Sequence, residues 1–235
     1  MSGFHLTFFM EAEDFKRREI EITADGSATI FLPSLNEHYH SVKGALTESD
    51  YIFLNCGLLH SSKKEVNILE IGFGTGLNAV VTACGCKNKQ LHYFTLERFP
   101  LAWDEVRSLH YDKIFDAEAM EVLEKIHRAD WETEQPVTEN FSIIKKECDL
   151  TLPEFEFPQG MDVVYFDAFA PEKQPEMWTD EVFSRIYDCM NEGGILTTYC
   201  AKGEIRRRMQ ATGFHVERLQ GPPNGKREIL RGTKE

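Results

Sequence analysis

A glycine-rich stretch that directly follows a short apolar run is the part of the sequence best suited to binding a cofactor. The run Ile68–Ile71, which contains the acid Glu70, predicts a buried strand, and glycines follow at every second position, Gly72, Gly74 and Gly76. Glycine lets the backbone approach a ligand closely and adopt φ values that other residues avoid. The apolar residues that come next predict the start of a helix. Strand, glycine loop and helix in this order are typical of a nucleotide-binding βαβ unit.

The spacing of these glycines distinguishes between cofactors. A dinucleotide fingerprint, G-x-G-x-x-G, would require glycine at position 77, where this chain has Leu77. The E-x-G-x-G-x-G spacing is similar to the first motif of class I S-adenosylmethionine (SAM) methyltransferases, although a glycine turn in an unrelated α/β fold is the alternative. That resemblance implies that Glu70 helps to hold the methionine ammonium of SAM. It also implies that cofactor-binding residues extend along the loop: Gly72, Phe73, Gly74, Gly76 and Asn78.

Acids also follow the next two β-prone runs. The run Leu91–Leu96 ends at Glu97, which lies 21 residues after the last glycine of the loop (97 − 76). An acid about 20 residues beyond the loop, at the end of the second strand, can bind both ribose hydroxyls of a nucleotide. After a third expected strand over residues 141–145, the resemblance to class I methyltransferases makes Asp149 the candidate for the adenine amino group, with Glu147 as the alternative.

The acid Asp167 is the candidate for the reaction itself. It follows the mostly apolar run Asp162–Phe166, and the carboxyl ends of parallel strands meet at one edge of a sheet, so it should face the same crevice as the glycine loop. Amino-directed methyltransferases use a comparable strand-end motif, in which the acid orients the target nitrogen and an aromatic residue packs on the substrate. Here Phe169 and Pro171 follow the acid. The simpler interpretation of Asp167 is a turn or helix-capping residue.

Length and composition limit the class of protein. With 235 residues, 42% hydrophobic and 28% charged, the chain suits a globular α/β domain, which we place at residues 61–235, with an extension over residues 1–60. No apolar run is long enough to cross a membrane, and residues 1–14 lack the pattern of a signal peptide. The six scattered cysteines form no C-x-x-C pair, so we expect reduced thiols, a cytoplasmic location and no metal.

The charge is unevenly distributed along the chain. The net charge of −13 argues against non-specific coating of nucleic acid. Residues 199–235, however, contain nine Lys or Arg residues against four acids, and a globally acidic protein can present one basic face. Within this segment Arg206, Arg207, Lys226 and Arg227 form a candidate phosphate-binding patch. A solvated surface is the ordinary interpretation of such a run.

The remaining patterns predict the elements that position these residues. Two β-prone runs around Asp25-Gly26 predict a hairpin, and residues 45–54 predict a helix. This part of the chain could cover the ligand site or only a face of the sheet, and the sequence does not separate the two. His127 is expected as a partly buried residue of an amphipathic helix over residues 116–131. Before that helix, we expect Pro100 in the first turn of another one. After it, we expect a helix from Thr179 to Gly193-Gly194. The whole predicts a Rossmann-like, mostly parallel seven-stranded sheet with helices on both faces.

Motifs over nearly the whole chain resemble the methyltransferase part of the bacterial tRNA 5-methylaminomethyl-2-thiouridine enzymes (MnmC type, or the stand-alone MnmD type). The most specific is the block D-x-F-A-P-x-K-x-P-x-M-W-T from Asp167 to Thr179. Two departures are Ala168, where the family pattern has glycine, and the third-strand acids, which match poorly. Other matching pieces are Thr23–Ser27, Tyr39–Ser41, Glu48–Phe53, Glu70–Asn78, Gly213-Phe214 and Gly225–Glu228.

The resemblance implies methyl transfer from SAM to the aminomethyl nitrogen of a modified uridine at the wobble position of tRNA. It also implies a set of substrate contacts beyond the basic patch: Tyr39, Phe169, Pro171, Lys173 and Trp178. At this length we expect no flavin-dependent oxidase domain, so a separate enzyme would supply the aminomethyl group. The other hypotheses are methyl transfer to a small-molecule amine, and a non-catalytic SAM-fold module that binds RNA or a partner.

Overall fold

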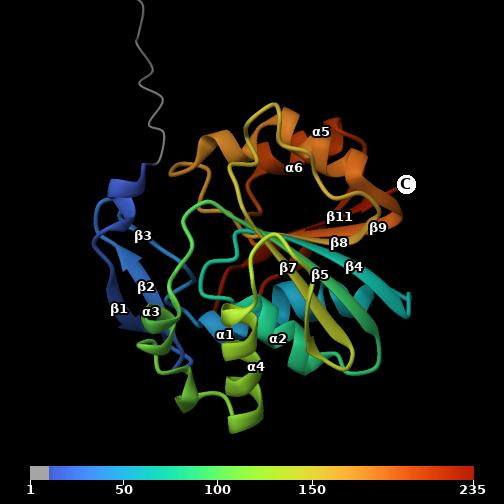
Figure 1. The fold of residues 1–235 in the computed structure, drawn as a ribbon. Helices are drawn as coiled ribbons and strands as arrows, with labels where there is room; N and C mark the ends of the chain where they lie inside the picture. The colour runs from blue at the N-terminus through green and yellow to red at the C-terminus, as the bar shows by residue number, and fades with distance from the viewer. Residues whose placement is uncertain (1–10) are drawn as a thin grey trace, which may run out of the picture.

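The computed structural model describes residues 11–235, which contain two sheets. Figure 1 shows the larger sheet at the centre of the molecule and the smaller one beside it, at the left of the view. The larger sheet has eight strands in the order β10-β11-β9-β8-β4-β5-β7-β6. These strands are β4 (Glu65–Ile71), β5 (Gln90–Glu97), β6 (Gln135–Thr138), β7 (Phe141–Glu147), β8 (Met161–Phe166), β9 (Met190–Thr198), β10 (Phe214–Gln220) and β11 (Glu228–Lys234).

The middle of this sheet is parallel and its edges are antiparallel. Strand β4 pairs in parallel with β5 and β8, and β7 and β9 continue the parallel arrangement on either side. Strand β11 is antiparallel to both β9 and β10, and the short strand β6 is antiparallel to β7. The expected Rossmann-like, mostly parallel sheet is confirmed, with β6 as one strand more than the sequence predicted.

Helices cover both faces of the sheet. They are α1 (Ala45–Glu48), α2 (Leu77–Gly85), α3 (Trp103–Arg107), α4 (Ala117–Arg128), α5 (Asp180–Cys189) and α6 (Gly203–Ala211). In Figure 1, α5 and α6 lie on one side of the sheet and α2 and α4 on the other. Successive strand residues point to opposite faces, so Ile68 joins the apolar core that includes α2, and Leu69 joins the core that includes α5.

The smaller sheet consists of β1 (Glu19–Ile22), β2 (Ala28–Leu32) and β3 (Glu37–His38), all antiparallel. The expected hairpin around Asp25-Gly26 is confirmed. Oδ2 of Asp25 accepts a hydrogen bond of 2.8 Å from the backbone nitrogen of Thr47, which ties the turn to α1. The helix expected over residues 45–54 is α1 followed by a π-helix, Ser49–Asn55. Apolar side chains of β2 belong to the same core as those of α2, so the smaller sheet packs directly against the helical layer on one face of the larger sheet.

Two local predictions were wrong. Helix α5 ends at Cys189, and Gly193-Gly194 lie within β9, whose pairing with β8 shifts register at this end. Pro100 precedes α3 instead of starting it, because Ala102 is extended and caps a helix that begins at Trp103. Among residues 11–235, no helix is long and apolar enough to cross a membrane. The signal-peptide prediction concerns residues that lie mostly outside the described part of the chain.

Candidate active site

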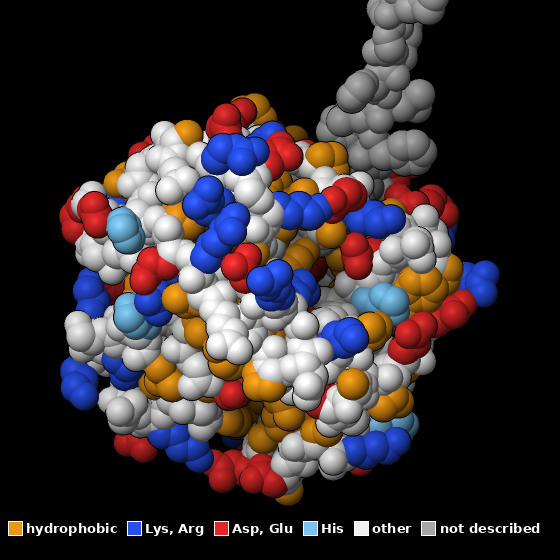
Figure 2. Space-filling model, turned by 180° about the vertical axis from the view of Figure 1, so that it is seen from behind, with side chains coloured by type: hydrophobic (Ala, Val, Ile, Leu, Met, Phe, Trp, Pro, Cys, Tyr) orange, Lys and Arg blue, Asp and Glu red, His pale blue; other side chains and the backbone are white. Residues whose placement is uncertain are grey.

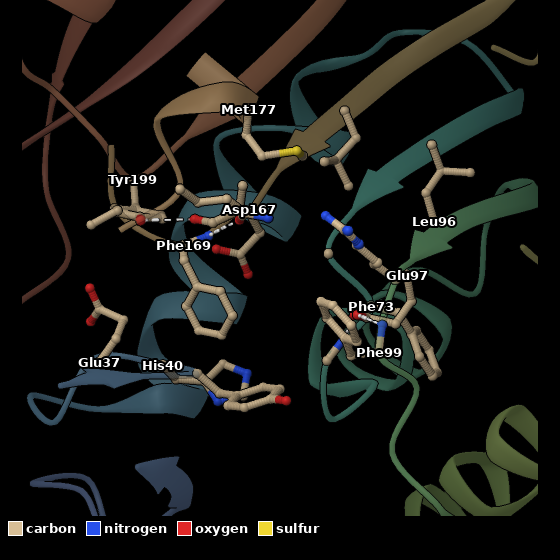
Figure 3. Close-up of a pocket in the computed structure, with 18 of the residues that line it drawn as sticks. Glu37, His40, Phe73, Leu96, Glu97, Phe99, Asp167, Phe169, Met177 and Tyr199 are labelled. Carbon is tan, nitrogen blue, oxygen red and sulfur yellow. Dashed lines mark hydrogen bonds between the residues drawn. The ribbon is translucent and has the colours of Figure 1, made fainter. Parts of the chain in front are cut away.

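A cavity of about 370 Å³ lies at the carboxyl ends of the parallel strands. It is lined by residues that follow β4, β5, β7 and β8, by residues near β3, and by Lys226 from the loop between β10 and β11. Its volume falls in the range of small-molecule sites. Figure 3 shows Glu97 on one side and Asp167 and Tyr199 on the other, with the ring of Phe169 between Asp167 and His40.

The glycine loop forms one wall of the cavity. Gly72 has a φ of +92°, and a Cβ atom there would come within 2.6 Å of the carbonyl oxygen of Asp167. Gly76 has a φ of +72° but lies behind the wall, where a Cβ atom would come within 2.7 Å of Nε2 of His127. The first glycine therefore allows the close approach to the end of β8, and the last allows the loop to rest on α4. The loop residues that line the cavity are Gly72, Phe73, Gly74 and Asn78.

His127, on α4, supports the loop from behind. Burial lowers its pKa to about 4, so the imidazole is neutral near pH 7. Its Nε2 lies 2.9 Å from the carbonyl oxygen of Thr75, so the tautomer that carries the proton on Nε2 donates a hydrogen bond to the loop. Nζ of Lys145 donates to the backbone carbonyl of His127 at 2.7 Å. The prediction of a partly buried helix residue is confirmed for His127.

Glu97 reaches the cavity from the end of β5 and is held there by backbone donors. Its Oε2 accepts from the nitrogen of Gly74 at 3.0 Å and its Oε1 from the nitrogen of Phe99 at 2.8 Å. Asp149 also lines the cavity, whereas Glu147 is exposed at the end of β7 and does not. The structure thus brings together Glu97 and Asp149, the residues predicted for ribose and adenine, and it separates Glu147 from them.

Glu70 does not line the cavity but is fully buried beneath the loop. Its Oε2 accepts a hydrogen bond of 2.7 Å from Oγ1 of Thr95. Burial raises the pKa of Glu70 to about 8, so the protonated acid predominates at neutral pH. Oε1 of Glu70 and Oδ1 of Asn78 are both buried without a hydrogen-bond partner among the described residues. Gly72 and Asn78 form the cavity wall at this point, so the assignment of Glu70 to the methionine ammonium stays a prediction.

Asp167 lies directly after β8, with its carboxyl group toward the cavity (Figure 3). Its Oδ2 accepts a hydrogen bond of 2.9 Å from Nδ2 of Asn78. Burial, and to a lesser degree the nearby carboxylate of Glu48, raises the pKa of Asp167 to about 7. A carboxyl group with such a pKa exists in both protonation states near neutral pH, which suits it to accept a proton from a substrate.

Two aromatic rings stand in the same cavity. Phe169 and Tyr39 meet edge to face with ring centroids 5.4 Å apart, and both line the wall. Trp178 is buried and does not line it; its Nε1 instead donates a hydrogen bond of 2.8 Å to the carbonyl oxygen of Phe169. Pro171 and Lys173 are not part of the wall either. Of the predicted substrate contacts in this block, the structure brings Phe169 to the cavity and gives Trp178 a supporting position.

Glu48 is a cavity residue that sequence reasoning missed. It is buried at the end of α1, where its Oε2 accepts from the backbone nitrogen of Ser41 at 3.0 Å and its Oε1 pairs with Nζ of Lys226 at 2.7 Å. The ammonium group of Lys226 also lies 4.3 Å from the ring centroid of Tyr199. The signal available in the sequence was that Glu48 begins one of the matching pieces. Lys226, predicted to contact phosphate, thus lies at the cavity, while Arg227 is exposed.

Comparison with known proteins identifies the fold and the cofactor. Residues 110–235 match the model of a family of S-adenosyl-L-methionine-dependent methyltransferases. The chain belongs to this family. Its cofactor is therefore SAM, and the cavity residues fit it: Gly72 and Gly74 leave the loop free of side chains where a ligand must approach, and Glu97 presents a carboxylate suited to ribose hydroxyls.

The methyltransferase is similar to parts of larger curated relatives. The tRNA 5-methylaminomethyl-2-thiouridine biosynthesis bifunctional protein MnmC of Paraburkholderia xenovorans is 28% identical over 210 residues, which cover 83% of this chain and 32% of the relative. The protein of the same name from Pseudoalteromonas atlantica is 30% identical over 241 residues, covering 92% of this chain and 33% of the relative. The chain thus spans about a third of the length of these curated relatives.

Solved structures support the fold. MnmC2 from Aquifex aeolicus superposes with a TM-score of 0.69 at 24% identity, covering 93% of this chain and 70% of that one. Spermidine synthase from Thermotoga maritima superposes with a TM-score of 0.62 at 15% identity, covering 93% and 69%. At these identities the likeness establishes the fold of the methyltransferase and nothing about its substrate.

Proposed function

We propose that this methyltransferase transfers the methyl group of SAM to the nitrogen of a 5-aminomethyl group on the wobble uridine of tRNA, with or without 2-thiolation. The product would be 5-methylaminomethyl-(2-thio)uridine. The names of the curated relatives support this substrate for the part of them that the chain matches. The reaction requires a tRNA that already carries the aminomethyl group, so a separate activity would have to supply it.

The position of Asp167 is the observation that carries this proposal. Its carboxyl group shares one cavity with the glycine loop and Glu97, and it stands beside the rings of Phe169 and Tyr39. A carboxylate suits an amine, because it accepts hydrogen bonds from N–H groups and stabilises positive charge. The two rings suit a flat base. Together they provide the features that an aminomethyl-pyrimidine needs next to the methyl donor.

The chain's residues would act mainly by positioning. SAM supplies an electrophilic methyl group when it is bound. Asp167 would hold the amine by a hydrogen bond, accept a proton from its ammonium form, and direct the lone pair toward the methyl carbon. That proton would pass from Asp167 to solvent before methyl transfer, so the group is again a carboxylate when the nitrogen becomes positively charged, and it stabilises that charge. Phe169 and Tyr39 would keep the base in place and exclude water from the cavity.

Exposed basic residues would bind the tRNA backbone. Arg207 and Arg227 are exposed and Arg206 is partly buried, and phosphate contacts need side chains that can reach the surface. Figure 2 shows Lys and Arg side chains gathered over the upper part of the rear face, with acidic side chains among them. Such a mixed surface favours a few placed phosphate contacts over broad coating of RNA, as the net charge of −13 also indicates.

The test uses labelled SAM and tRNA from cells that lack this modification, followed by nucleoside analysis. We expect label at the wobble uridine, and transfer to a small-molecule amine without any tRNA requirement would overturn the proposal. Asp167→Ala should lower kcat by at least about a hundredfold, in the range that general acid–base residues contribute. Asp167→Asn, which keeps the shape, serves as the matched variant. Affinity for S-adenosylhomocysteine should persist in both, and normal turnover of Asp167→Ala would refute its role.

A further inference from the structure

The ammonium group of Lys226 rests on two features that bind cations in proteins generally. One is the carboxylate of Glu48, at 2.7 Å, and the other is the face of the Tyr199 ring, at 4.3 Å from its centroid. The side chain of Lys226 is 35% exposed, whereas that of Glu48 is 8% exposed. The flexible partner is therefore the lysine, and the acid belongs to the interior.

Glu48 and Tyr199 are held in place by contacts that do not involve Lys226. Oε2 of Glu48 accepts from the backbone nitrogen of Ser41 at 3.0 Å. The hydroxyl of Tyr199 donates to the carbonyl oxygen of Ala168 at 2.9 Å, directly beside Asp167, as Figure 3 shows. Carboxylate and ring thus stay in position when the lysine moves, next to the residue proposed to orient the amine. All of these groups line or border one cavity.

We propose that Glu48 and Tyr199 form the subsite that receives the ammonium group of the substrate beside Asp167, and that Lys226 occupies this subsite until the substrate arrives. The inference rests on the proposed function in one respect, that the substrate is a primary amine. It adds the residues that select the amine and a reason for the position of Lys226.

Charge balance explains why the subsite holds a lysine. A buried carboxylate without a cation is destabilised, so Glu48 favours a cationic partner. Exchange of the Lys226 ammonium for the substrate ammonium keeps that balance, and lysine suits it because its charge sits at the end of a flexible stem. The released Lys226, next to the exposed Arg227, is then free to meet a tRNA phosphate. A uridine without the aminomethyl group cannot displace the lysine, so it is rejected.

The experiment measures discrimination between two tRNAs in the presence of S-adenosylhomocysteine, which prevents turnover. The first tRNA carries 5-aminomethyl-2-thiouridine at the wobble position and the second carries unmodified uridine. We expect the wild type to bind the first more tightly, and Glu48→Gln to reduce the ratio of the two dissociation constants by about tenfold or more, the effect of one hydrogen bond to a charged group.

Variants of the lysine separate the subsite from general tRNA binding. Lys226→Gln removes the cation that has to be displaced and also the phosphate contact that the released lysine makes with the aminomethyl tRNA. Because Glu48 remains to bind the ammonium group, the ratio should fall less than in Glu48→Gln. Arg227→Gln is the matched control, expected to weaken both tRNAs with an unchanged ratio. Should Glu48→Gln fail to fold, as judged by thermal unfolding, Glu48→Asp keeps the charge but retracts it, and should still reduce the ratio about threefold.

Three results would overturn the inference. The first is that the folded glutamate variant, Glu48→Gln or Glu48→Asp, has the same ratio of dissociation constants as the wild type. The second is that this ratio falls in Lys226→Gln as much as in Glu48→Gln, since the ion pair would then be purely structural. The third is a wild type that does not discriminate at all. Methyl transfer by the wild type distinguishes these results from failure of the proposed function. If the wild type methylates the tRNA but the variants leave the ratio unchanged, only the ammonium subsite is refuted. If the wild type does not methylate the tRNA, the proposed function and the subsite are both refuted.

Discussion

The side-chain nitrogen of Asn78 donates a hydrogen bond of 2.9 Å to Oδ2 of Asp167. Asn78 belongs to the first turn of α2, just after the glycine loop, and Asp167 follows β8. This bond therefore joins the wall that meets the cofactor to the residue proposed to orient the amine. It also lowers the pKa of Asp167, against the larger effect of burial. One amide thus influences both where the carboxyl group lies and the pH at which it becomes charged.

Replacing Asn78 with alanine should shift the pH dependence of the reaction. Without the donor the pKa of Asp167 rises above about 7, so kcat/KM should begin to increase only at higher pH. Turnover at pH 7 should fall about 10- to 100-fold, the value of a hydrogen bond to a charged group. Methyl transfer to tRNA measured between pH 6 and 9 gives both quantities.

Asn67→Ala is a suitable control, because Asn67 makes a similar side-chain hydrogen bond, 3.0 Å to the carbonyl oxygen of Gly160, outside the cavity wall. It should affect stability and leave the acidic limb of the profile in place. An unshifted limb in Asn78→Ala would show that Asp167 is not the group whose ionisation limits the rate.

Glu70 should make the fold less stable as the pH rises. Its pKa is about 8 in the folded protein against 4.5 when exposed, so the folded state binds more protons between these values. Stability from this group is therefore fully present below about pH 4.5 and is lost as the pH rises through about 8. Asp167 acts in the same direction up to about pH 7, whereas Lys145, whose pKa burial lowers to about 8, adds stability above that pH, so the effect of Glu70 is read from the difference between the wild type and a Glu70 variant.

Glu70→Gln, which keeps an acceptor for Thr95, should remove the decline above pH 7. At pH 9 the variant should be more stable than the wild type by on the order of 1–3 kcal/mol. Urea unfolding at pH 5, 7 and 9 measures this difference. A wild-type stability that is flat or rises from pH 7 to 9, with no gain in the variant, would mean that Glu70 is already ionised in the folded state.

His127 should contribute to cofactor binding without touching the cofactor. His127→Phe removes the donor to the carbonyl oxygen of Thr75 but keeps a ring of similar shape. We expect affinity for S-adenosylhomocysteine to fall about three- to tenfold, the net value of one hydrogen bond that positions the loop. Isothermal titration measures it. His92→Phe, on β5 outside the cavity wall, is the matched control and should bind like the wild type.

Parts of the site that depend on local order could be predicted from the sequence. Alternation and apolar runs locate β4, β5 and β8, and in a parallel sheet the carboxyl ends of these strands meet at one edge. This is why Glu97 and Asp167 were expected in one crevice, and both line the cavity. The helical spacing of α4 likewise placed His127 on a partly buried face, although it did not reveal the contact with the glycine loop.

The rest depends on contacts between distant parts of the chain. Glu48 and Lys226 are 178 residues apart, and no periodicity in the sequence connects a short helix with a loop between the last two strands. Glu70 matched the motif by spacing, but whether its side chain faces the cavity or the layer beneath depends on how the loop packs. Trp178 belongs to the family block by sequence, but its burial beneath Phe169 depends on how the chain packs after β8.

The order of synthesis on the ribosome determines when Glu48 can pair with Lys226. Glu48 emerges 178 residues before Lys226, which at typical synthesis rates is a delay of roughly 10 to 40 seconds. Strand β11 also has to insert between β10 and β9 before the larger sheet is complete. During that interval Glu48 has no Lys226 to neutralise its carboxylate. The cation that occupies the proposed ammonium subsite is consequently available only late, after translation has passed the loop that carries Lys226.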